Sequence, residues 1–424
     1  MKKNLIIIVN SYPYEYGEPY LEDEVKILEN YFEKIYFVIP EKQFLKNLET
    51  QNYYVPKNIA GIIKYAQPFT KAQKLKSLFN IFSTAILSEI KIIRKTYKLP
   101  ITFFKLKVLL SLYAKGKDFK NTLQKLVIDE SLKSAEIVLY SYWCNEFAIA
   151  IALLKQENPQ FNCYTRVHGG DLYFHRNGEN YLPLRTFLAS QLNNIISISE
   201  SGKTYLQQKI NAPQLNNKII CSKIGTLPIE KVFANDVTTQ LNILTLAFLS
   251  DLKRIEILID ALGTIENVNI NWTHIGGGHK HYEDFVKQHA TSKLDKKQNI
   301  KYEFIGSTPK HKAFEIIRQR NIHLLVNTSV YEGIPVSMME ALSMGIPVLG
   351  IDVGAVNEIV INGISGTLLP TNATYIDVAK EIIHFATLEN AAFQDHKDKA
   401  FNFWQQHYSA QNNFKKLAEC LTQQ

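Results

Sequence analysis

Short apolar runs alternate along this chain with stretches of helical periodicity. Runs at residues 5–9, 135–140, 192–199 and 244–249 each stop at polar or glycine residues. The last run precedes residues 257–262, whose apolar side chains recur at helical spacing. Strands that alternate with helices form βαβ units, and the loops of such units gather at one edge of a parallel sheet. The pattern therefore predicts an α/β fold.

The chain is long enough for two domains. At 424 residues it exceeds the size at which one hydrophobic core stops growing. Residues 226–241 contain Pro228 and few apolar clusters, which is typical of a linker. We therefore expect an N-terminal domain at 1–225, a second domain at 242–400, and an amphipathic helix at 401–424.

Composition narrows the class of protein. Hydrophobic residues make up 46% and charged residues 21%, as in soluble globular proteins. The first apolar run is far shorter than a membrane span and lacks a small-residue cleavage site, so we expect a buried strand there instead of a signal peptide. The four cysteines are widely spaced without a CxxC pair, and they predict neither a disulfide framework nor a zinc site.

Two glutamates flank a predicted helix start in the second half of the chain. Glu332 is followed by Gly333 and Pro335, which indicate a loop, and Glu340 lies about two helical turns further on. The loop leaves free N–H groups at a helix N-terminus, which suits a diphosphate without requiring a metal. An isolated glutamate pair is also common at ordinary helix starts. The glycine-rich turns that follow, at 345–350 and 352–366, favour a ligand site.

A second candidate cluster follows an apolar-alternating strand that stops at His168. The next two residues are glycines, which let the backbone turn sharply. A lone histidine at such a place is more often structural. Arg166 and Asp171 flank the turn, and we expect an ion pair between them to hold the loop.

These clusters together resemble retaining glycosyltransferases of family 4, such as bacterial capsule, O-antigen and exopolysaccharide enzymes. The likeness is sharpest at residues 163–173 and 328–370. It implies the GT-B fold, in which two Rossmann-like domains face each other across a cleft. It also implies an acceptor-side first domain, a donor-binding second domain, and a last helix that returns to the first domain.

The resemblance implies roles for individual residues. Glu332 contacts the donor sugar, Glu340 the ribose, and Lys253 the diphosphate, while His168 faces the donor sugar from the first domain. His168, Glu332 and Lys253 are the expected catalytic residues. Further expected donor contacts are Arg254, Ile305, Gly306, Gly333, Ile334, Pro335, Val336, Ser337 and Glu340. Candidates on the acceptor side are Gly17, Glu18 and Asp171.

The sequence departs from the family pattern at three positions. Phe248 stands five residues before Lys253, where an arginine is usual. Ala355 and Asn357 replace a frequent glycine and proline in a later loop. Binding of the diphosphate is therefore expected to depend more on Lys253 and on the loop between the two glutamates.

Positive charge is concentrated between residues 64 and 125. This segment holds 13 lysines and one arginine against Glu89 and Asp118, so it carries 14 − 2 = +12, while the whole chain carries +8. Interleaved apolar residues suit an anionic membrane surface, to which each cation contributes on the order of 1 kcal/mol. Nucleic-acid binding and a simply solvated face are the alternatives, and we expect no nucleic-acid partner.

The sequence thus predicts a retaining, metal-independent glycosyltransferase without a cofactor. It would move a sugar from a nucleoside diphosphate to a saccharide or polyprenyl-linked acceptor during bacterial cell-surface polysaccharide synthesis. Its expected location is cytoplasmic, peripheral at the inner face of the cytoplasmic membrane. An epimerase or phosphorylase on the same fold, and a non-catalytic glycan- or membrane-binding module, remain open because a fold does not fix a reaction.

Overall fold

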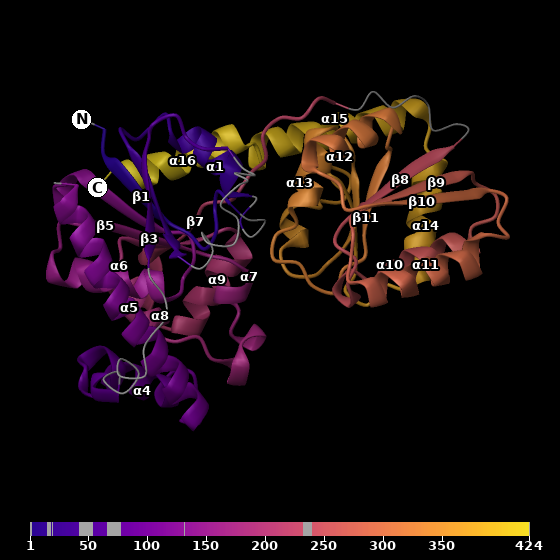
Figure 1. The fold of residues 1–424 in the computed structure, drawn as a ribbon. Helices are drawn as coiled ribbons and strands as arrows, with labels where there is room; N and C mark the ends of the chain where they lie inside the picture. The colour runs from indigo at the N-terminus through magenta and orange to yellow at the C-terminus, as the bar shows by residue number, and fades with distance from the viewer. Residues whose placement is uncertain are drawn as a thin grey trace. The chain divides into compact units, whose positions relative to one another are not determined.

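The computed structural model describes residues 2–14, 18, 20–41, 54–65, 78–130, 132–231 and 240–423. The chain divides into two compact units (Figure 1). Unit 1 comprises Met1–Ile224 and Asn413–Gln424, and unit 2 comprises Gly225–Asn412. Gly17, residues 66–77 of the basic segment and residues 232–239 of the expected linker lie outside the described residues.

Unit 1 is built on a parallel sheet whose described strands run in the order β3-β2-β1-β4-β5-β6-β7. Its strands are β1 (Asn4–Ile8), β2 (Ile35–Pro40), β3 (Ile59–Tyr65), β4 (Ile137–Ser141), β5 (Asn162–Val167), β6 (Asn194–Ser197) and β7 (Ile219–Cys221). The central strands are almost wholly buried, as expected where helices cover both faces of a parallel sheet. Because β1 pairs with both β2 and β4, the chain order reverses there, and loops at the carboxyl ends of β1 and β4 border a crevice.

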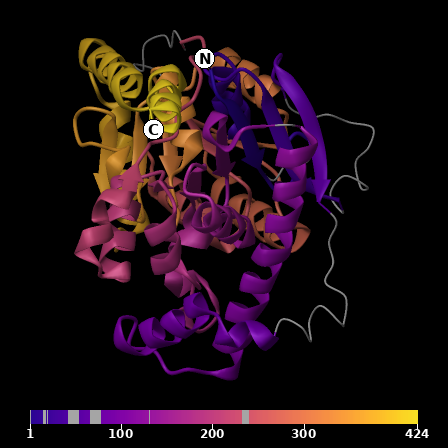
Figure 2. The ribbon, with the colours of Figure 1, turned by 90° about the vertical axis from the view of Figure 1, so that its left-hand side faces the viewer.

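Two helices of unit 1, α5 and α6, form a packed pair. The helices that precede the second unit are α1 (Leu21–Leu28), α4 (Thr84–Lys95), α5 (Phe103–Asp129), α6 (Glu146–Glu157), α7 (Gly169–Leu172), α8 (Arg185–Gln191) and α9 (Glu200–Ile210). Helix α5 packs along α6, and Gly116 permits this approach because a Cβ there would lie 2.6 Å from Cγ2 of Ile149. Helix α4 lies near the N-terminal end of α5, at the bottom of unit 1 in Figures 1 and 2. No helix within the described ranges is both long and apolar enough to cross a membrane.

Unit 2 contains a second parallel sheet, whose described strands have the order β10-β9-β8-β11-β12-β13. The strands are β8 (Leu241–Leu246), β9 (Ile270–Ile275), β10 (Ile300–Gly306), β11 (Leu324–Asn327), β12 (Val348–Ile351) and β13 (Gly366–Leu369). The helices are α10 (Ile255–Thr264), α11 (Lys280–Leu294), α12 (Lys310–Gln319), α13 (Val336–Ser343), α14 (Tyr375–Ala386) and α15 (Asn390–His407). Strand β8 pairs with β9 and β11, so the switch in chain order lies between β8 and β11.

The C-terminal stretch expected as one helix forms two. Helix α15 ends at His407 and α16 spans Ala410–Thr422. The break has a physical cause, since Ser409 leaves the helix to form a β-bridge with Thr226. Residues up to 412 belong to unit 2, where Trp404 donates through Nε1 to Oγ1 of Thr226 at 2.9 Å. Residues from Asn413 onward belong to unit 1.

Candidate functional site

Lys253 and Glu332 meet where β8 and β11 end. Lys253 closes the short 3-10 helix η6 (Asp251–Lys253) after β8, and Glu332 follows β11. The Nζ atom of Lys253 lies 2.5 Å from Oε1 of Glu332. The same oxygen accepts from Asn327 Nδ2 at 3.1 Å and from Ser329 Oγ at 2.7 Å. The other oxygen, Oε2, has no hydrogen-bond donor among the described residues.

Backbone and side-chain hydrogen bonds fasten the loops that carry this pair. Thr328 Oγ1 donates to the carbonyls of Lys253 and Arg254, both at 2.9 Å. Arg254 in turn donates a hydrogen bond through Nε to the carbonyl of Thr328 at 2.9 Å. Its backbone has φ +45, and it is the N-cap of α10. Arg254 therefore fixes the loop that presents Lys253.

Glu340 lies in the second turn of α13 and has a basic partner. Its Oε1 is 3.1 Å from Nζ of Lys310, the first residue of α12. Strand β10 ends just before α12, at the expected donor contacts Ile305 and Gly306. Gly306 has φ +82, a conformation that side chains disfavour, although a Cβ there would meet nothing within 4 Å. Lys310 was not among the site residues expected from the sequence, where its only signal is its place after a strand-end glycine.

Helix α13 begins directly after the predicted glycine-rich loop. Residues 333–335 form the turn, Pro335 is the N-cap, and Val336 and Ser337 open the helix. Pro335 has no side-chain donor or acceptor to cap the first turn. The first N–H groups of the helix therefore remain available for an anion. Ser337 also lines a small cavity between the ends of β8 and β11, together with Lys253, Asn327 and Ser329.

The second glycine turn packs against the first glutamate. Gly354 has φ +58, and a Cβ built on it would lie 1.7 Å from the carbonyl oxygen of Glu332. The loop after β12 therefore supports the backbone of Glu332 from behind. Ala355, a departure from the family pattern, is wholly buried beside it.

Phe248 occupies the position where an arginine was expected. Its half-exposed ring packs edge-on against His279, with the ring centroids 5.0 Å apart. The glycine run after β9 allows the two loops to come this close. A Cβ at Gly276 would lie 1.9 Å from the carbonyl oxygen of Ala247. Phe248 thus contacts an aromatic ring at the position where an arginine was expected.

His168 in unit 1 has a buried, neutral ring. Its ring packs against both Tyr142 and Trp143, with centroid distances of 4.8 and 4.6 Å. Both ring nitrogens are buried and have no hydrogen-bond partner among the described residues. Burial, reinforced by the charge of Arg166, lowers the pKa of His168 to about 3. At neutral pH the imidazole therefore offers one N–H donor and one acceptor.

The expected ion pair between Arg166 and Asp171 is wrong. Arg166 pairs with Glu24 of α1 at 2.5 Å, and both side chains are fully buried. Asp171 is at the third position of α7, and its carboxylate accepts the backbone N–H of His168 at 2.5 Å and that of Cys144 at 2.7 Å. A carboxylate so placed caps the start of its own helix, which turns it away from Arg166. Burial raises the pKa of Asp171 to about 6.

Glu18 is buried and anchors the loop after β1. Its carboxylate accepts the backbone N–H groups of Asn10, Ser11 and Tyr12 at 2.8 to 2.9 Å. It also accepts Nε1 of Trp143 at 2.5 Å, which links this loop to the aromatic wall of His168. Contact between Glu18 and an acceptor stays a prediction, and so does the acceptor-side role of Asp171.

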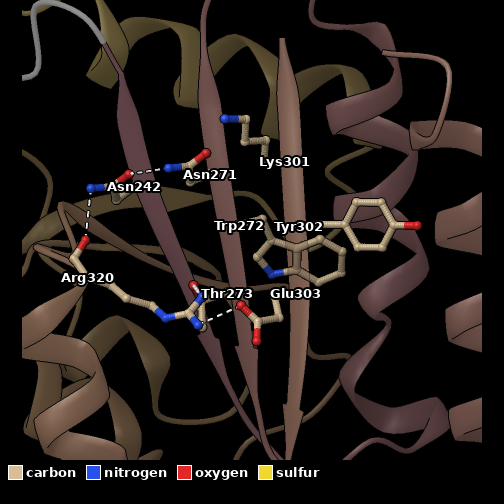
Figure 3. Close-up of a pocket in the computed structure, with 8 residues that line it drawn as sticks. All are labelled: Asn242, Asn271, Trp272, Thr273, Lys301, Tyr302, Glu303 and Arg320. Atoms are coloured by element: carbon tan, nitrogen blue, oxygen red, sulfur yellow. Dashed lines mark hydrogen bonds and ion pairs between the residues drawn. The ribbon is translucent and has the colours of Figure 1, made fainter. Parts of the chain in front are cut away.

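A separate pocket of about 270 Å³ lies along β8, β9 and β10 (Figure 3). It is lined by Asn242, Asn271, Trp272, Thr273, Lys301, Tyr302, Glu303 and Arg320. Its strand residues all precede the last two residues of their strands, whereas the expected donor contacts lie at or after the strand ends. This pocket is therefore distinct from the candidate site. In the part of the chain that the structure describes, no three His, Cys, Asp or Glu side chains gather as a metal site.

Replacing Gly354 with Ala should displace the Glu332 loop. The new Cβ would overlap the Glu332 carbonyl, so we expect a loss of several kcal/mol in stability and faster hydrogen exchange at residues 329–335. Gly363 is the matched control, because its φ is +72 but a Cβ there meets nothing within 4 Å. Gly363→Ala should cost only about 1–2 kcal/mol and leave that exchange unchanged. Equal effects of the two variants would contradict the contact.

His168→Gln should make the protein less sensitive to acid. The unfolded histidine takes up a proton near pH 6.5 but the folded one only near pH 3, so stability falls as the pH drops below 6.5. Between pH 7 and pH 5 the wild type should lose about 2 kcal/mol more than the variant. Denaturant unfolding at both pH values measures this difference. Parallel losses would show that the ring is protonated normally.

Part of the chain is similar in sequence to known glycosyltransferases. Residues 230–399 match the family model described as Glycosyl transferases group 1. A curated relative, an uncharacterized glycosyltransferase of Methanocaldococcus jannaschii, is 24% identical over 237 residues. That alignment covers 55% of this chain, and it spans only 61% of the relative's length.

Solved structures match along almost the whole chain. The lipopolysaccharide outer core galactosyltransferase WaaB aligns with a TM-score of 0.66 and 13% identity, covering 99% of each chain. A glycosyltransferase from Rickettsia africae gives 0.67 and 11%, covering 100% of this chain and 98% of its own. Anabaena Alr3699/HepE in complex with UDP-glucose gives 0.60 and 15%, with full coverage of both chains. The chain therefore has the GT-B fold, and its unit 2 carries the match to glycosyl transferases group 1.

Proposed function

We propose that this protein is a retaining glycosyltransferase of family 4 that uses a nucleoside-diphosphate sugar. The observation that carries the proposal is the Lys253–Glu332 pair at the end of β8 and β11, beside the open start of α13. Ligands of open α/β sheets bind at such a switch point. A cation and free helix N–H groups suit a diphosphate, and the unused oxygen of Glu332 suits sugar hydroxyls.

The donor half of the reaction rests on unit 2. Lys253 and the N–H groups that open α13 hold the diphosphate and stabilise the charge that builds on it as the sugar leaves. Oε2 of Glu332 accepts hydrogen bonds from the sugar, and Glu340 accepts them from the ribose. Arg254 keeps Lys253 in place through its bond to Thr328. No bound metal is required in this scheme.

The transfer itself proceeds on one face of the sugar. The bond from the anomeric carbon to the phosphate oxygen breaks, and a bond to the acceptor hydroxyl oxygen forms on the same face. The acceptor proton passes to the departing phosphate oxygen. No second carboxylate on the opposite face is needed, in contrast to glycoside hydrolases. The neutral ring of His168 serves as a hydrogen-bond donor to the sugar.

Uridine is the base that the structural comparisons favour for a first assay. The Anabaena neighbour was solved with UDP-glucose and with UDP. We further propose a saccharide or polyprenyl-linked acceptor of cell-surface polysaccharide synthesis, for which WaaB, described as a lipopolysaccharide galactosyltransferase, is a structural parallel. Incubation with donor alone separates an epimerase, which would isomerise the donor, from a transferase.

An anionic membrane surface is the proposed location of the acceptor. Phe82 in the 3-10 helix η1 (Leu78–Phe82) is 77% exposed, and Phe103 at the start of α5 is 83% exposed. Exposed cations lie on α4 and between α4 and α5: Lys91, Arg94, Lys95 and Lys98. Aromatic rings flanked by cations suit the headgroup region of a bilayer. We infer peripheral attachment at the inner face of the cytoplasmic membrane.

Lys253→Met and Glu332→Gln test the donor site. A thermal-shift panel of nucleoside diphosphates and their sugars first identifies the donor, because a ligand of the folded state raises the Tm. With that donor we expect each variant to lower kcat/KM for transfer about 100-fold. Lys287→Met is the control, since Lys287 pairs with Glu283 on the outer surface of α11. Unchanged transfer in Lys253→Met or Glu332→Gln would refute the site.

Phe82→Ser combined with Phe103→Ser tests the membrane surface. Binding to liposomes that contain anionic lipid, measured by flotation, should fall about tenfold or more. The reason is that the variant lacks two apolar rings whose transfer from water into the bilayer would stabilise binding. Phe285→Ser on α11, where the ring is also exposed, is the control. Wild-type binding should weaken as salt rises. Undiminished flotation of the double variant would exclude this surface.

A further inference from the structure

Helix α4 carries an ionisable residue on its buried side. Ile86, Glu89 and Ile93 face inward at helical spacing, and Glu89 is only 1% exposed. The exposed cations lie on the rest of the same helix. A buried carboxylate is costly unless other groups satisfy it. The partners of Glu89 therefore show what this side of α4 supports.

The hydrogen-bond partner of Glu89 lies in the segment before α8. Tyr181 donates through its hydroxyl to Oε1 of Glu89 at 3.0 Å. Leu184, the residue before Arg185, has φ +62, a conformation that is unfavourable for leucine. Burial raises the pKa of Glu89 to about 7, while Leu184, Tyr181 and the charge of Arg185 act in the opposite direction. Tyr97 is the other titratable group beside it.

Arg185 connects this cluster to the turn that carries His168. Its side chain is 3% exposed, and its NH2 group donates to the carbonyl of Asp171 at 2.7 Å. Its NH1 group donates to the carbonyl of Pro183 at 3.1 Å. Asp171 in turn holds the backbone N–H of His168. The planar guanidinium of Arg185 donates to two carbonyls at once, and a lysine ammonium is poorly suited to replace it.

A second contact fixes the same segment from α5. Lys105, which is buried, pairs with Glu179 at 2.6 Å, and Thr102 also donates to that carboxylate. Gly178 lies against Phe104, since a Cβ there would be 2.5 Å from the ring. Residues 178–185 therefore rest on both α4 and α5, and Arg185 is the member of this segment that reaches the His168 turn.

We propose that Arg185 is a positioning residue that holds the His168–Asp171 turn, and that Glu89, which accepts the Tyr181 hydroxyl, supports the segment that leads to Arg185. The inference rests on the proposed function, because His168 has its role in transfer there. It assigns Arg185 no contact with donor or acceptor. It also means that α4 serves the site through its inner side.

The test compares Arg185→Met, Arg185→Lys and Glu89→Gln with wild type. Arg185→Met should lower kcat by at least about tenfold, because small misplacements of a catalytic group are costly. The Kd for UDP should stay within about twofold, since the diphosphate contacts lie in unit 2. Arg185→Lys and Glu89→Gln should fall between Arg185→Met and wild type. Arg176→Met, on an exposed arginine of the same loop region, should match wild type.

A second measurement reports the accessibility of the His168 ring and does not require sugar transfer. Diethyl pyrocarbonate labelling, followed by peptide mass spectrometry, should be slow at His168 in wild type because the ring nitrogens are buried. It should be several-fold faster in Arg185→Met, with labelling of the exposed His281 unchanged. If Arg185→Met does not fold, Arg185→Lys decides by the same two measurements.

The outcomes separate this inference from the proposed function. Wild-type kcat and labelling in a folded Arg185→Met, or in Arg185→Lys when Arg185→Met does not fold, would overturn the positioning role. Loss of UDP binding together with kcat would also overturn it, as a general effect on folding. If wild type shows no transfer, or His168→Ala transfers normally, the proposed function fails, and the labelling still decides whether Arg185 holds His168.

Discussion

The contact between Lys253 and Glu332 joins the loops after β8 and β11, and the candidate site of unit 2 depends on it. Thr328, Asn327 and Ser329 all bond to one of these two residues. Gly354 presses on the Glu332 backbone from the next loop. Three strand ends are therefore held by one pair. Because the pair is partly shielded from water, its attraction is screened less than that of a surface ion pair.

Unit 1 is organised around buried charge in a similar way. Arg166 and Glu24 lie beneath the His168 turn with their side chains fully buried, and Tyr140 and Tyr142 face the guanidinium at 5.9 Å. Removing one partner of such a pair leaves an uncompensated charge, which costs about 3–5 kcal/mol. Tyr142 also forms one wall of the His168 ring site. Burial and the charge of Arg166 together lower the pKa of His168, so the ring stays neutral beside this buried pair.

The sequence predicted the parallel sheets and the strand-end position of most candidate residues, because apolar runs and glycine turns depend on local periodicity. It placed Lys253 and His168 correctly after their strands. It did not predict that Arg166 selects Glu24, 142 residues away, over Asp171. Nor did it indicate that Glu18 is enclosed by backbone N–H groups, or that Lys310 meets Glu340. Such choices of partner are set by tertiary packing, which no sequence spacing reports. The break between α15 and α16 also depends on a distant residue, Thr226.

A site for an anion has to store positive charge while it is empty. In unit 2 the ammonium of Lys253 rests on a carboxylate that is itself a candidate ligand group, so the two charges offset each other at this point. Glu332 thus lies where the proposed diphosphate would meet Lys253. An anion that binds Lys253 therefore competes with Glu332 for the ammonium group.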